Sequence, residues 1–133
     1  MKTLRITAFV LLGLILTSVD SPAQQTKQTQ TTTIEVIQFH SEHRCVTCVQ
    51  IEKITKATLE KYFKGIPFTL VNVDDAKNAK KAEQFEAAGT ALYLFNPKTG
   101  KKKDLTEFAF MKAFDEKKFE AELKKQIEDF IKS

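Results

Sequence analysis

Short apolar runs alternate with segments of helical spacing from residue 34 to the end of the chain. Three of these runs predict strands, at Ile34–Phe39, Phe68–Val73 and Ala91–Phe95. We expect a fourth strand over Lys103–Phe110. The stretch Asn96–Gly100 before it is rich in turn residues, so the last two strands should form a hairpin.

Three further segments have the apolar spacing of helices. The first runs from Cys45 to about Lys64, and the second from Asp74 or Asp75 to about Ala88. The third is capped by Asp115 and has an apolar stripe of Phe119, Leu123, Ile127, Phe130 and Ile131. The order β-α-β-α-β-β-α predicts an α/β fold, with a four-stranded mixed sheet flanked by helices. Its first two strands should be parallel and its last two antiparallel.

The N-terminus has the pattern of a secretory signal peptide over residues 1–23. Two basic residues, Lys2 and Arg5, flank the start of an apolar core, and Ser21-Pro22-Ala23 fits a cleavage site. An uncleaved anchor is the alternative, but the apolar run is shorter than the ~20 residues that a membrane span needs. Residues 24–33 are polar and predict a flexible tether, which leaves residues 34–133 as one domain. We therefore expect a periplasmic or secreted protein with no stable membrane span after cleavage.

Composition narrows the class of protein only slightly. The chain has 133 residues, 42% of them hydrophobic and 29% charged, which is typical of a globular domain. Its net charge of +4 is too small to indicate a nucleic-acid partner. We expect no cofactor, and the sequence leaves the oligomeric state open.

The two cysteines, Cys45 and Cys48, both lie in the predicted exported part. A disulfide between them would close a loop of two residues and constrain the unfolded chain very little, so chemistry is a better reason for the pair than stability. The pair follows the first predicted strand, where a helix begins. Helix N-terminal N–H groups favour a thiolate there, and the neighbouring Arg44 and His43 add positive charge. Cys48 is placed to resolve a mixed disulfide formed on Cys45.

This pattern predicts thiol–disulfide exchange with protein thiols or disulfides, or with small thiols. A Zn or Cu site is an alternative, because His40 and His43 lie close to the two cysteines in the sequence. The spacing of these four residues is compressed for a tetrahedral site and Arg44 opposes a cation, so we expect no metal. A non-catalytic binding or redox-sensing module is the other alternative.

From about Ile34 to Ser133 the chain resembles the thioredoxin-like superfamily. The resemblance rests on the first strand, the Cys45–Cys48 motif, strand Phe68–Val73 followed by Asp74, the Leu92–Phe95 hairpin strand and the closing helix. It implies that Cys45 is an exposed nucleophile and Cys48 a buried resolving thiol.

The sequence departs from that family in several places. Arg44-Cys45-Val46-Thr47-Cys48 replaces Trp-Cys-Gly-Pro-Cys, and this leaves the direction of electron flow open. Gln38 aligns with the family's buried acid and Leu70 with the lysine that accompanies it, so proton transfer to Cys48 needs water or another group; Glu52 is one candidate. Thr90 aligns with the proline that lines the substrate groove with a cis peptide bond. We expect Thr90 to line that groove with a trans bond, and we expect a narrow range of partners.

Overall fold

The computed structural model describes residues 33–133. The predicted signal peptide (1–23) and the predicted tether up to residue 32 lie outside the described residues. Within residues 33–133, no helix is both long and apolar enough to cross a membrane.

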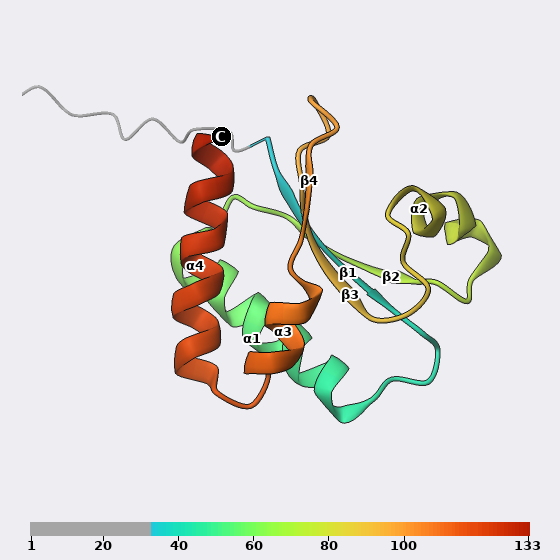
Figure 1. The fold of residues 1–133 in the computed structure, drawn as a ribbon, viewed down its shortest axis with the longest axis horizontal. Coiled ribbons are helices and arrows are strands. Elements are labelled where there is room, and N and C mark those ends of the chain that lie inside the picture. Colours follow the sequence, from blue (N-terminus) through green and yellow to red (C-terminus); the bar gives the residue numbers. More distant parts are fainter. Residues whose placement is uncertain (1–32) are drawn as a thin grey trace, which may run out of the picture.

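The centre of the fold is a four-stranded mixed sheet (Figure 1). Its strands are β1 (Glu35–His40), β2 (Phe68–Asn72), β3 (Ala91–Phe95) and β4 (Lys102–Asp104), in the order β2-β1-β3-β4. β1 pairs in parallel with β2 and antiparallel with β3, and β3 pairs antiparallel with β4. This arrangement confirms the predicted α/β class, the parallel first pair and the terminal hairpin.

Helices cover both faces of the sheet. Helix α1 (Val46–Tyr62) joins β1 to β2, and α3 (Thr106–Lys112) and α4 (Glu116–Lys132) follow β4. These three helices lie together on one face, whereas α2 (Ala79–Gln84) lies apart from them (Figure 1). The chain therefore has two layers of core, one on each side of the sheet.

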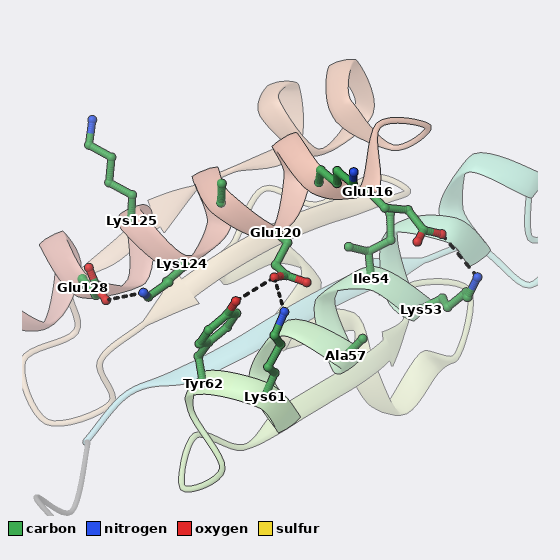
Figure 2. A pocket seen from close by; sticks show the side chains of 12 residues that line it. Lys53, Ile54, Ala57, Lys61, Tyr62, Glu116, Glu120, Lys124, Lys125 and Glu128 are labelled. Carbon is green, nitrogen blue, oxygen red and sulfur yellow. Dashed lines mark hydrogen bonds and ion pairs between the residues drawn. The ribbon is translucent and has the colours of Figure 1, made fainter.

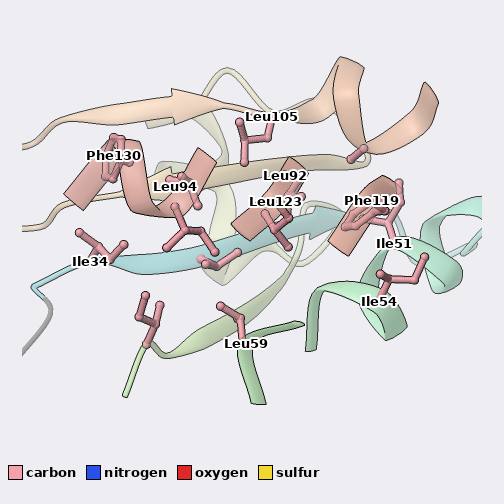
Figure 3. Close-up of a cluster of buried hydrophobic side chains, with 14 of the residues drawn as sticks. Ile34, Ile51, Ile54, Leu59, Leu92, Leu94, Leu105, Phe119, Leu123 and Phe130 are labelled. Carbon is pink, nitrogen blue, oxygen red and sulfur yellow. The ribbon is translucent and has the colours of Figure 1, made fainter. Parts of the chain in front are cut away.

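The side chains of β1 alternate between these two layers. Val36 packs into the layer under α1, α3 and α4, whereas Ile37 and Phe39 pack with Phe85 into the other layer. Figure 3 shows the first of these layers, with Leu94 of the sheet and Leu123 of α4 among its side chains. Gln38 is fully buried, and strand alternation places it on the same face as Val36, toward the helices. The alternation thus brings one polar side chain into the apolar layer that supports α1.

Helix α4 buries most of its predicted stripe. Phe119, Leu123 and Ile127 are fully buried and Phe130 is nearly so, while Ile131 at the end of the stripe is partly exposed. Asp115 caps this helix, as predicted, because its carboxylate accepts a hydrogen bond from the Lys118 amide.

The predicted fourth strand over Lys103–Phe110 is wrong beyond its first residues. β4 ends at Asp104, and the chain then forms α3. Asp104 accepts a hydrogen bond from the Thr106 amide at 2.8 Å, which starts the turn. Ala109 and Ala113, one helical turn apart, are fully buried. The small alanines let the helix approach the core closely, and this packing overrides the strand-like alternation of the phenylalanines.

The second helix is shorter than predicted. Asp75 caps a short 3-10 turn, η1 (Ala76–Asn78), before α2, but α2 ends at Gln84 instead of near Ala88. Glu86 adopts a left-handed φ of 53°, and the Ala87 amide bonds back to the Ala82 carbonyl at 2.9 Å. This is the hydrogen-bond pattern of a Schellman cap, and it turns the chain so that Ala87 is buried.

Candidate redox site

Cys45 and Cys48 form a disulfide where the loop after β1 enters α1. The S–S distance is 2.05 Å and the two Cα atoms are 5.1 Å apart. Cys45 is the N-cap residue of α1, with extended backbone angles (φ −76°, ψ 158°), and Cys48 lies in the first helical turn. The strand-to-helix junction therefore presents both sulfurs at a helix N-terminus, as the sequence predicted.

The two cysteines differ strongly in exposure. Cys45 is exposed to solvent, whereas the side chain of Cys48 is 4% exposed. The backbone amide of Cys48 donates a hydrogen bond to Cys45 Sγ at 3.1 Å. This N–H is one of the helix donors that have no partner within the helix. Because it already points at the exposed sulfur, it is placed to stabilise negative charge there after the disulfide opens.

The buried side chain of Gln38 forms a hydrogen bond with the backbone of Cys48. Its Nε2 donates a hydrogen bond of 2.8 Å to the Cys48 carbonyl, and its Oε1 has no hydrogen-bond partner among the described residues. Gln38 is in register with Leu70 on β2. The two residues that align with the family's acid and lysine therefore lie side by side on neighbouring strands, and neither can ionise.

Thr90 contacts the disulfide, although it lies 42 residues after Cys48 in the sequence. Its hydroxyl donates a hydrogen bond to Cys48 Sγ at 3.0 Å, and its side chain is partly exposed. The peptide bond before Thr90 is trans, as predicted, and residues 33–133 hold no cis peptide bond. Thr90 thus lies at the border between the buried sulfur and solvent.

Arg44 is paired with Glu52. Arg44 Nη2 lies 2.5 Å from Glu52 Oε2, and Lys56 Nζ lies 2.5 Å from the other carboxylate oxygen. Burial raises the pKa of Glu52, but the hydrogen bonds from Lys56 and Arg44 outweigh it and hold the pKa below its usual value. Glu52 is therefore ionised at neutral pH and offsets the charge of Arg44. A carboxylate held by two cations is also a weak proton acceptor for Cys48.

The two histidines do not converge on the cysteines. His43 is exposed in the loop before α1, and His40 Nδ1 lies 2.8 Å from the Ser41 carbonyl oxygen. Across residues 33–133, no group of three or more His, Cys, Asp or Glu side chains is arranged to hold a metal ion. The metal alternative gains no support from this geometry.

Apolar side chains flank the exposed sulfur. Val46 and Val49 belong to the same helical turn as the disulfide and are 78% and 48% exposed. Exposed valines at a helix start are not needed for the core. They form an exposed apolar border in the helical turn that follows Cys45.

A groove of about 630 Å³ lies elsewhere, between α1 and α4 (Figure 2). Neither cysteine lines it. Its charged groups are paired across the helices: Glu120 accepts hydrogen bonds from Lys61 and Tyr62, both at 2.7 Å, and Glu116 pairs with Lys53. These contacts hold the two helices together, and the groove is separate from the disulfide chemistry.

The structure thus brings together four of the residues singled out in the sequence: Cys45, Cys48, Gln38 and Thr90. The pairing of Arg44 with Glu52 was missed, as was the contact of the Thr90 hydroxyl with sulfur. Alternation along the first strand could have indicated that Gln38 faces the helix, because Val36 and Gln38 share a face. No local sequence signal links Thr90 to Cys48, since the contact depends on how β3 enters the sheet.

No protein-family model and no curated protein matches this chain. Among solved structures, one described as the structure of a malarial protein is similar, with a TM-score of 0.43 and 24% identity. That match covers 60% of this chain and 94% of the other. A likeness of this size identifies neither a family nor a function. What the fold and site define is an α/β protein that carries a Cys-x-x-Cys disulfide at a strand-to-helix junction.

Proposed function

We propose that this protein is a thioredoxin-like thiol–disulfide oxidoreductase. One observation carries the proposal: an exposed sulfur, Cys45, caps a helix and is bonded to a buried sulfur, Cys48, whose own amide donates to it at 3.1 Å. A disulfide across two residues contributes little stability. The asymmetric burial instead supports a division of roles, in which the exposed sulfur reacts with a partner and the buried sulfur resolves the mixed disulfide.

The proposed exchange begins when a partner thiolate attacks Cys45 Sγ. The bond between Cys45 and Cys48 breaks, Cys48 leaves as a thiolate, and a mixed disulfide joins Cys45 to the partner. A second partner thiolate then attacks the partner's sulfur, which releases an oxidised partner and the reduced Cys45–Cys48 pair. The same steps in reverse reduce a partner disulfide, with Cys45 as the nucleophile and Cys48 as the resolving thiol.

The helix terminus supplies most of the proposed thiolate stabilisation. Arg44 adds less than its full charge because Glu52 offsets it, and His43 lies exposed two residues before Cys45. The apolar border of Val46 and Val49 favours a partner that presents its cysteine among apolar side chains. We further propose that the protein acts in the periplasm or after secretion, on the basis of its N-terminal signal pattern.

A trapping experiment tests this proposal. In Cys48→Ser the mixed disulfide on Cys45 cannot be resolved, so covalently linked partners should accumulate in cells and disappear on reduction. Cys45→Ser is the matched control, because it removes the attacking sulfur and should trap nothing. Wild-type protein should also show a defined midpoint in glutathione buffer and turnover in insulin reduction.

Two outcomes would count against the enzyme. A normal midpoint with no turnover and no linked partner would favour the non-catalytic redox-sensing module. Equal alkylation rates for the reduced Cys45 thiol and free cysteine at neutral pH would remove the basis for Cys45 as an activated nucleophile.

A further inference from the structure

Among the described residues outside the Cys-x-x-Cys segment, the Thr90 hydroxyl donates a hydrogen bond to Cys48 Sγ at 3.0 Å. Thr90 lies just before β3, far from Cys48 in sequence. Its side chain is partly exposed, whereas Cys48 is 4% exposed. The hydroxyl therefore reaches from solvent to a sulfur that water contacts very little.

The groups around Cys48 are otherwise neutral or paired. Gln38 bonds to the Cys48 carbonyl, not to its sulfur. Of the charged groups nearby in the chain, Glu52 is paired with both Arg44 and Lys56. His40, at the end of β1, lies against the Ser41 carbonyl, and His43 is exposed. Among the described contacts of Cys48, no ionisable side chain is placed to take its proton.

We infer that the Thr90 hydroxyl stabilises the Cys48 thiolate and conducts the Cys48 proton to solvent in the resolving step. The inference deepens the proposed function and rests on it. A hydroxyl is suited to this role because it donates one proton and accepts another at the same oxygen. The Thr90 hydroxyl thus takes the role of the buried acid that the thioredoxin-like family has at the position aligned with Gln38.

The step balances as follows from the mixed disulfide on Cys45. The Cys48 thiol gives its proton to Thr90 Oγ1, which releases its own hydroxyl proton to water. The Cys48 thiolate attacks Cys45 Sγ, forming the Cys45–Cys48 bond as the bond to the partner sulfur breaks. The partner leaves as a thiolate and takes a proton from water, so the partner is reduced and the cysteine pair is oxidised.

The effect should appear mainly in the reduced protein. A disulfide sulfur is a weak acceptor, whereas a thiolate is a charged acceptor and forms a much stronger hydrogen bond. Thr90 therefore favours the dithiol form over the disulfide form. Losing its hydroxyl should slow resolution at neutral pH by about tenfold, the lower end expected for a hydrogen bond to a charged group.

Reaction of the reduced protein with dithionitrobenzoate, an aromatic disulfide, distinguishes the reaction of Cys45 from that of Cys48. The first released thionitrobenzoate reports attack by Cys45, and the second reports resolution by Cys48. Thr90→Val keeps the shape of the side chain but lacks the hydroxyl. It should slow the second phase about tenfold relative to the first and move the pH profile of the second phase to higher pH. Thr90→Ser should restore the second phase, and the Thr90→Val disulfide should become harder to reduce in glutathione buffer.

The outcomes separate this inference from the proposed function. A second phase in Thr90→Val as fast as in wild type, or equally slow phases in Thr90→Ser and Thr90→Val, would overturn the inference. Wild-type protein that releases no second thionitrobenzoate would instead overturn the proposed function. Unfolding curves of the oxidised variants check folding, and Thr90→Ser provides a working comparison if the valine variant is unstable.

Discussion

Replacing Gln38 by methionine tests whether the buried amide beneath the disulfide stabilises the fold. Gln38 is fully buried, and one half of its amide is satisfied: Nε2 donates to the Cys48 carbonyl at 2.8 Å. The other half, Oε1, has no donor within residues 33–133. Methionine has nearly the same length and volume but no polar atoms to satisfy.

The expected magnitude follows from these two halves. Losing the hydrogen bond from Nε2 costs about 1 kcal/mol. Removing a buried acceptor without a partner returns about 1–3 kcal/mol. The Gln38→Met variant should therefore be more stable than wild type by about 1 kcal/mol. Gln38→Ala removes the same polar atoms but leaves a cavity, so it should be less stable than the methionine variant by about 2 kcal/mol.

Urea unfolding of both variants with the disulfide intact measures these differences. The slope of the transition should stay the same, so that a change in midpoint reports a change in the free energy of unfolding. If Gln38→Met loses more than about 1 kcal/mol, Oε1 has a partner, such as a bound water, and the amide stabilises the fold. That result would refute the reasoning.

Three further predictions concern side chains outside the cysteine pair. Glu86→Gly should stabilise the protein by about 0.5 kcal/mol in thermal unfolding, because glycine adopts the left-handed φ of 53° without strain; no gain relative to Glu86→Ala would count against this. Burial, followed by the Asp104 carboxylate, raises the pKa of Tyr93 to about 12. The stability from its neutral phenol is full below pH ~10 and should be lost as the pH rises toward 12, a loss that Tyr93→Phe should lack; parallel alkaline unfolding curves would contradict it. The pKa of Glu52 lies below its usual value of 4.5, so the stability from its ion pairs is present above pH 4.5 and lost in acid. Glu52→Gln should be less stable than wild type by about 1 kcal/mol at pH 7, and a gap that persists in strong acid would rule out this cause.

The order of elements could be predicted wherever apolar pattern and turn chemistry agree. β3 has its predicted bounds, and α1 begins next to the predicted Cys45. The pattern failed over Thr106–Lys112 because alternating phenylalanines fit a strand, whereas the buried alanines fit a helix against the core. A window of this length holds both periods, and only packing against the rest of the fold decides between them.

The candidate site likewise has features that the sequence predicts and features that depend on tertiary packing. The sequence by itself determined that two cysteines separated by two residues follow a strand and start a helix, because the period changes from two to 3.6 at that point. The resemblance implies a buried Cys48, and its side chain is 4% exposed. The tertiary structure alone decided that Arg44 pairs with Glu52 and that the Thr90 hydroxyl donates to Cys48 Sγ. The physical reason is that helical period and capping act between residues close in the chain. The contacts of Gln38 and Thr90 with Cys48 form only when β1, α1 and β3 pack together.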